Sequence, residues 1–177
     1  MRKIRDIRQL TYASGLFLAI TLTAAWASTG TDGVLTQLQA DDLRVVQAGE
    51  QIYRAQCAAC HGEALEGQDN WQTRDRDGFL PAPPHDASGH TWHHADDLLF
   101  EITKYGAAVV IDDPDYRTNM PVYKGILSDD EIVAVLSFIK NTWPDEQRQW
   151  QEEVNANVTG ERLPAKKGSS FLDKLLK

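Results

Sequence analysis

The sequence predicts an all-α domain, because three segments show helical periodicity and almost nothing shows the alternation of a β-strand. The three segments are residues 41–57, 95–106 and 128–144. Apolar residues recur in them at three- and four-residue steps, which places these side chains on one face of a helix. Only residues 107–111 suggest a strand, and their sequence fits equally well a loop packed on an apolar group.

Local signals mark the ends of the predicted helices. Ser128 is followed three residues later by Glu131, the pattern of a capping box, and Pro144 ends that helix. The middle helix begins with two aspartates and stops at Gly106. In the first helix, Gly49 costs about 1 kcal/mol relative to alanine, which indicates that another helix crosses closely there.

The first 27 residues have the pattern of an export signal. A basic start is followed by a short apolar run, and Ala-Trp-Ala at positions 25–27 suits signal peptidase. An uncleaved anchor is the alternative, because residues 10–27 approach the roughly 20 apolar residues that span a bilayer. Polar residues in this run favour cleavage after Ala27. Both interpretations place the domain in the periplasm, either soluble or anchored to the inner membrane.

The charge of the chain limits its partners. Cleavage after Ala27 would change the formal net charge from −8 to −11, because four basic residues and one acidic residue are lost. Such a protein repels phosphate groups and attracts a partner with a basic patch, so nucleic acid is not expected as a ligand. The acidity could equally serve solubility alone.

The two cysteines, Cys57 and Cys60, belong to a Cys-x-x-Cys-His sequence that His61 completes. This is the attachment pattern of c-type haem, in which two thiols add to the porphyrin vinyl groups and the imidazole becomes an axial ligand of the iron. A redox dithiol would not require the histidine. Haem attachment outside the cytoplasm agrees with the export signal.

Met120 lies in a turn-rich loop just before the last predicted helix. A single methionine usually fills a gap in a hydrophobic core. A thioether opposite histidine is, however, a known way to complete haem iron and raise its potential, and the loop is placed to fold over the ring. We therefore expect Met120 to be the second axial ligand.

These features together resemble the small class I cytochromes c exported by bacteria. The matching segments are Gly49–Gly62, Ile102–Gly106 and Asn119–Lys140. The resemblance implies the cytochrome c fold, with three principal helices around one covalently bound haem c. It implies thioether links at Cys57 and Cys60, a proximal ligand at His61 and a distal ligand at Met120. It also implies that the first and last helices cross near Gly49 and Phe138.

The resemblance further implies an electron carrier and not an enzyme. Its partners would be redox proteins, such as an oxidoreductase or a membrane complex of a respiratory chain, and the N-terminus could attach it to the membrane. A haem enzyme or sensor stays open as an alternative, in which Met120 dissociates and peroxide or a diatomic gas binds.

The chain divides into four predicted parts. Residues 1–27 are the signal peptide or anchor, residues 28–42 a linker, and residues 43–145 the cytochrome domain. Residues 146–177 prolong the last helix or form a separate polar one, followed by a basic tail. This tail is either a frayed terminus or a docking peptide for a partner or membrane.

A histidine-rich stretch precedes the middle helix. Its histidines are His85, His90, His93 and His94, which follow an extended proline-rich run. We expect their side chains to form hydrogen bonds within the loop, and we expect Trp92 to pack against the haem or the core. The sharper hypothesis is a copper or zinc site built from His90, His93 or His94 with Asp86 or Asp96. A further alternative replaces Met120 on the iron by one of these histidines.

Overall fold

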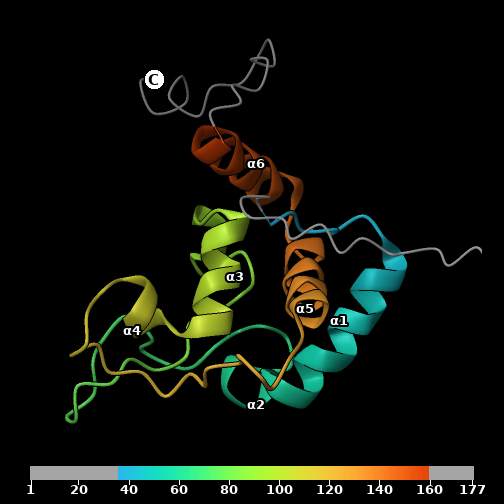
Figure 1. The fold of residues 1–177 in the computed structure, drawn as a ribbon. Helices are drawn as coiled ribbons and strands as arrows, with labels where there is room; N and C mark the ends of the chain where they lie inside the picture. Colours follow the sequence, from blue (N-terminus) through green and yellow to red (C-terminus); the bar gives the residue numbers. More distant parts are fainter. Residues whose placement is uncertain (1–35, 160–177) are drawn as a thin grey trace, which may run out of the picture. The chain divides into compact units, whose positions relative to one another are not determined.

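The computed structural model describes residues 36–159 (Figure 1). The predicted export signal and the basic tail after residue 159 lie outside the described residues. Within residues 36–159 no helix combines the length and the apolar character needed to cross a membrane.

The described part of the chain is helical and contains no β-sheet, which confirms the predicted fold class. The elements are α1 Leu43–Gln56, α2 Ala58–His61, η1 Thr91–His93, α3 Asp96–Tyr105, α4 Ala107–Val110, α5 Asp129–Asn141 and α6 Asp145–Thr159. Figure 1 shows α5 between α1 and α3, and α5 packs against both of them. The three predicted helices are therefore the main ones of this domain.

The helix ends follow the local signals closely. Glu131 N–H donates to the hydroxyl of Ser128 at 3.3 Å, and the Glu131 carboxylate accepts the Ser128 N–H at 2.8 Å, so the capping box is confirmed. At the other end of the domain, α1 is capped by Asp42, whose carboxylate accepts the N–H of Arg44 at 2.9 Å. The middle helix stops at Gly106, where φ is +89°.

Residues 107–111 are neither a strand nor a loop, so this part of the prediction is wrong. They form the single turn of α4, in which the N–H of Ile111 donates to the carbonyl of Ala107 at 3.0 Å. A run of five apolar residues has no periodicity that separates strand from helix. The left-handed conformation of Gly106 starts this turn, and no neighbouring strand is present among residues 36–159 to pair with it.

The crossing of α1 and α5 at Gly49 is also confirmed. A methyl group at Gly49 would lie 2.0 Å from the carbonyl oxygen of Ala134 and 3.0 Å from the Cβ of Phe138. One turn later, the rings of Tyr53 and Phe138 lie 5.4 Å apart. The close approach of two backbones therefore explains the glycine inside a helix.

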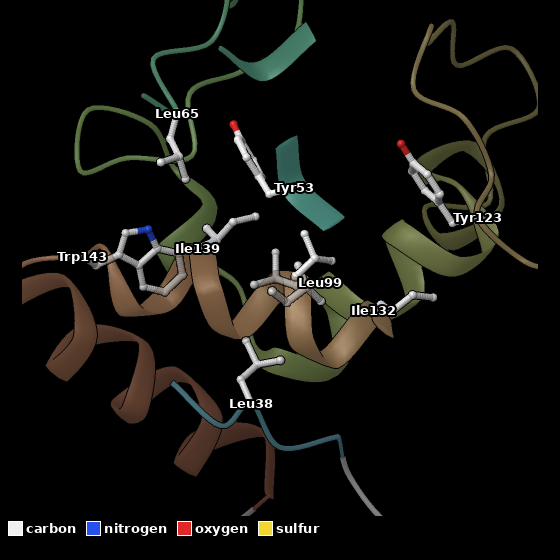
Figure 2. Close-up of a cluster of buried hydrophobic side chains, with 10 residues drawn as sticks. Leu38, Tyr53, Leu65, Leu99, Tyr123, Ile132, Ile139 and Trp143 are labelled. Atoms are coloured by element: carbon white, nitrogen blue, oxygen red, sulfur yellow. The ribbon is translucent and has the colours of Figure 1, made fainter. Parts of the chain in front are cut away.

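The core is centred on α5, with buried side chains from α1, α3 and the loops around them (Figure 2). Its labelled members in that view are Leu38, Tyr53, Leu65, Leu99, Tyr123, Ile132, Ile139 and Trp143. Leu38 precedes α1 and Trp143 follows α5, so segments on both sides of the main helices contribute to the same core.

The chain after Pro144 forms a separate helix, α6, and does not prolong α5. It packs on η1, and the side-chain amide of Gln151 donates to the carbonyl of His94 at 3.2 Å. The side-chain oxygen of Asn155 accepts the N–H of Asp96, the first residue of α3, at 2.9 Å. Polar contacts thus attach α6 to the domain.

A buried ion pair lies beneath α6. The Lys140 ammonium of α5 is 3.7 Å from the Asp96 carboxylate, and the two side chains are 4% and 5% exposed. Asp96 also accepts the N–H of Leu38 at 3.0 Å, and Lys140 pairs with Glu152 of α6 at 2.5 Å. These contacts connect α3, α5, α6 and the segment before α1.

Candidate functional site

The Cys-x-x-Cys-His sequence lies at the junction of α1 and α2. Cys57 joins the two helices, and the N–H groups of Cys60 and His61 donate to its carbonyl at 3.1 and 2.9 Å. This helical turn places residues three apart on one face. Cys57 is half-buried and Cys60 is exposed, and their thiols are not joined in a disulfide.

Two buried tyrosines hold the ends of this turn. The hydroxyl of Tyr53 donates to the carbonyl of Gly62, and that of Tyr123 donates to the carbonyl of Gln56, each at 2.8 Å. Figure 2 shows both hydroxyls pointing away from α5. Burial raises the pKa of Tyr123 to about 12 and that of Tyr53 further, so both remain protonated donors.

No local pattern in the sequence predicted these tyrosine contacts. Tyr53 and Tyr123 are 0% and 4% exposed. A buried tyrosine nevertheless needs a partner for its hydroxyl, and this requirement was the available signal. Which carbonyl accepts the hydrogen bond depends on the packing of α1 against distant segments.

His61 is oriented by the backbone of the proline-rich segment. Its ring is 7% exposed, and Nδ1 lies 2.9 Å from the carbonyl oxygen of Pro83. Burial lowers the pKa of His61, which favours the neutral ring. Because a carbonyl only accepts hydrogen bonds, Nδ1 carries the proton and Nε2 keeps its lone pair. His61 is therefore prepared to act as a metal ligand through Nε2.

Two glycines allow the chain to bring Pro83 to this position. A methyl group at Gly67 would lie 2.4 Å from the nitrogen of Pro84, and one at Gly89 would lie 2.1 Å from its carbonyl oxygen. Gly67 also has φ of +69°. Larger residues at either position would displace the Pro83 carbonyl from His61. No local pattern marks either glycine in the sequence, because only the tertiary contact shows why they are needed.

His85 packs directly on His61. The two rings are stacked with centroids 4.0 Å apart and planes inclined by 19°. Nδ1 of His85 lies 2.8 Å from the hydroxyl oxygen of Thr91, and its carbonyl accepts the indole N–H of Trp143 at 2.7 Å. Burial lowers the pKa of His85 well below its ordinary value, so this ring is neutral as well. The expected hydrogen-bonding role of His85 is thus present.

Met120 is half-buried and packs against the core in the loop before α5. Its N–H donates to the hydroxyl of Thr118 at 3.0 Å. The same loop reaches the attachment turn three residues later, where Tyr123 bonds the carbonyl preceding Cys57. The structure therefore ties the methionine loop to the turn that carries His61, whereas coordination by Met120 stays a prediction.

The remaining histidines are occupied with aromatic neighbours. The ring of His90 stacks on that of Trp71 with centroids 5.1 Å apart, and the ring centroids of His93 and Trp92 lie 3.8 Å apart. The ring of His94 meets that of His90 edge-on at 5.3 Å. Among residues 36–159 no group of three or more histidine, cysteine, aspartate or glutamate side chains could hold a metal ion. The copper or zinc hypothesis therefore has no ligand set in the described part of the chain.

A covalently bound haem c fits the donor set of this site. It requires two unpaired thiols one turn apart and a neighbouring imidazole with a free nitrogen, and Cys57, Cys60 and His61 supply them. Burial raises the pKa of the Cys57 thiol to about 11, which disfavours the thiolate. A thioether carries no charge, so it suits the same half-buried position.

Comparison with known proteins gives one match. A family model described as Cytochrome c matches residues 46–143, which is more than half of the chain. No curated protein and no solved structure matches the chain. The matched region begins in α1, includes the attachment turn and the loop of Met120, and ends just before Pro144.

Proposed function

Because the chain belongs to the cytochrome c family, as a monohaem c-type cytochrome with the covalent attachment motif at Cys57–His61, we propose that it carries single electrons between redox proteins outside the cytoplasm. Members of this family transfer electrons and are mostly not enzymes. The observation that carries the proposal is the buried, neutral His61, whose Nδ1 is bonded to the Pro83 carbonyl and whose Nε2 is left for iron.

Four residues would hold the cofactor. Cys57 and Cys60 would form the thioether links, and His61 and Met120 would supply a nitrogen and a sulfur ligand to the iron. Haem, when bound, would supply a one-electron couple at iron, with His61 and Met120 as its two ligands from the chain. The chain would thereby leave no coordination position for a substrate, which favours an electron carrier over an enzyme or gas sensor.

The surroundings of His61 favour electron transfer with little rearrangement. The Pro83 carbonyl fixes the ring, and the two tyrosines hold both ends of the attachment turn. The core excludes water from this side, since His61 is 7% exposed and Tyr53 fully buried. A rigid, dry environment keeps the ligands in the same place in both oxidation states.

Features of the sequence support a proposal for the compartment and for the partners. The export pattern of residues 1–27 supports a periplasmic protein, either released or anchored to the inner membrane. The net charge of −11 after cleavage supports redox partners, such as an oxidoreductase or a respiratory membrane complex, that present a basic surface near their own cofactor.

Purification of the full chain from cells that attach haem c tests the proposal. We expect a coloured protein whose mass includes one haem and whose pigment resists extraction by acidified acetone. The oxidised protein should show the weak sulfur-to-iron charge-transfer band in the far red, and Met120→Ala should lose it. Val122→Ala, two residues further along the same loop and 48% exposed at that side chain, is the matched control and should keep the band.

Three results would overturn parts of this proposal. A colourless protein, or pigment that acidified acetone removes, would exclude covalent haem. A wild-type protein without the far-red band would exclude Met120 as a ligand. Rapid binding of carbon monoxide to the reduced wild type would show an open or labile position and favour the enzyme or sensor class.

A further inference from the structure

We propose that His85 is a positioning residue that holds the imidazole plane of His61, the proximal haem ligand. This inference rests on the proposed function, because it concerns the orientation of a ligand to the iron. It extends that function to a residue outside the attachment motif. The observation that supports this inference is the stacking of the two imidazole rings. Their centroids lie 4.0 Å apart and their planes are inclined by 19°.

A single hydrogen bond does not fix a ring completely. The Nδ1 of His61 is bonded to the Pro83 carbonyl at 2.9 Å, and the ring could still rock about that bond. A flat group lying parallel against one face blocks this rocking, because rotation would bring the ring edges into contact. The His85 ring supplies such a group, since it lies against His61 in nearly parallel orientation.

His85 is itself held at three points. Its N–H donates to the carbonyl of Leu65 at 2.8 Å, and its carbonyl accepts the indole N–H of Trp143 at 2.7 Å. Its ring is fixed by the contact of Nδ1 with the hydroxyl of Thr91 at 2.8 Å. Thr91 is 5% exposed and begins η1, so a short helical turn anchors the ring. A residue restrained in this way can restrain its neighbour.

The stack also affects the charge of the ligand. If positive charge reached the His61 ring on oxidation of a bound haem, it would face the π surface of the His85 ring, which attracts positive charge. His85 would therefore stabilise the oxidised state relative to the reduced state. A leucine of similar size offers no such face, so its introduction should raise the reduction potential.

The test compares oxidised holoprotein variants by paramagnetic NMR. The shifts of the haem methyl groups depend on the orientation of the axial imidazole plane. We expect His85→Leu to redistribute these shifts and to raise the reduction potential. Thr91→Val removes the hydroxyl that contacts Nδ1 of His85 at 2.8 Å and that also donates to the carbonyl of Pro84 at 3.5 Å. It should redistribute the methyl shifts in the same direction by a smaller amount.

Thr103→Val is the matched control. Thr103 is also buried, at 8% exposure, and its hydroxyl donates to the carbonyl of Leu99 at 2.8 Å within α3. The control loses a comparable buried hydrogen bond and should keep the wild-type methyl shifts. If His85→Leu does not accumulate as holoprotein, the comparison rests on Thr91→Val, which keeps the His85 ring but removes a group that holds it.

The outcomes separate this inference from the proposed function. If the wild type carries covalent haem but Thr91→Val and His85→Leu keep its methyl shifts, His85 only fills space and the inference is wrong. If Thr103→Val changes the methyl shifts as much as Thr91→Val does, the effect reflects a general loss of rigidity in the domain, and the inference is also wrong. If the wild type carries no covalent haem, the proposed function itself fails.

Discussion

The hydroxyl of Tyr53 donates a hydrogen bond of 2.8 Å to the carbonyl oxygen of Gly62, across the turn that holds both cysteines and His61. Tyr53 lies in α1, before this turn, and Gly62 directly follows it. The tyrosine is fully buried and its ring packs on Phe138 of α5. The packing of the two main helices is therefore connected directly to the backbone that carries the ligand.

Tyr53→Phe should weaken the domain without changing its core volume. The Gly62 carbonyl would lose its donor, at an expected cost of about 1–2 kcal/mol in the free energy of unfolding. Chemical denaturation of the holoprotein, followed by circular dichroism, measures this loss. Tyr116→Phe, in the loop before Met120, is the control and should change stability by less than about 0.5 kcal/mol. Equal stabilities of the two variants would contradict the role of the Tyr53 hydroxyl.

Gly49→Ala should destabilise the crossing of α1 and α5. The new methyl group would lie 2.0 Å from the carbonyl oxygen of Ala134, so the helices must separate. Overpacking of this kind costs about 1–3 kcal/mol, which exceeds the gain of about 1 kcal/mol in helix propensity. Thermal unfolding measures the net loss. Gln47→Ala, exposed on the same helix, should leave the midpoint nearly unchanged, and a stabilised Gly49→Ala would refute the close approach.

Lys140→Met should be among the most destabilising single changes outside the haem site. It would leave the Asp96 carboxylate buried without its cation, which typically costs about 3–5 kcal/mol. Lys104→Met is the control, because its partner Asp129 is 64% exposed and such surface pairs contribute about 1 kcal/mol or less. Denaturant titrations of both variants make the comparison. The double variant Asp96→Asn with Lys140→Met should recover part of the loss.

Glu131→Gln should reduce the sensitivity of the domain to acid. Hydrogen bonds from the N–H and hydroxyl of Ser128 lower the pKa of Glu131 below its ordinary value of 4.5. The carboxylate therefore stabilises the fold fully above about pH 4.5, and this contribution is lost as the pH falls through the lowered pKa. A glutamine still accepts the Ser128 N–H but does not titrate.

Melting temperatures measured between about pH 7 and pH 3 check this prediction. The wild type should lose more stability on acidification than Glu131→Gln. Glu101→Gln, at an exposed position in α3, should retain the wild-type dependence. Identical acid profiles for the wild type and Glu131→Gln would show that the charge of Glu131 does not contribute to the stability of the fold.

Much of the molecule follows from local sequence. The periodicity of three segments, the capping box at Ser128 and the stop at Gly106 predicted the main helices, because these signals act within one or two turns. The attachment motif predicted the cofactor for the same reason, since the chemistry of Cys57, Cys60 and His61 depends on their spacing. Gly49 even indicated where two helices cross.

Apolar runs without periodicity were harder to interpret. Residues 107–111 form a helical turn, although their composition suits a strand or a loop equally well. The histidine-rich stretch suggested a metal site, yet its rings pack on tryptophans and on one another. In both cases the outcome depends on what lies opposite the segment, which no local pattern records.

The sequence by itself determined the helices, the attachment turn and the kind of cofactor, because each of these depends on neighbours within a few residues. Only the tertiary structure decided that Pro83 orients His61, that His85 stacks on it, and that Tyr53 and Tyr123 hold the turn. These contacts join residues that are 9 to 67 positions apart. Their partners are chosen by packing and by the need of buried polar groups for hydrogen bonds, which act on the folded chain.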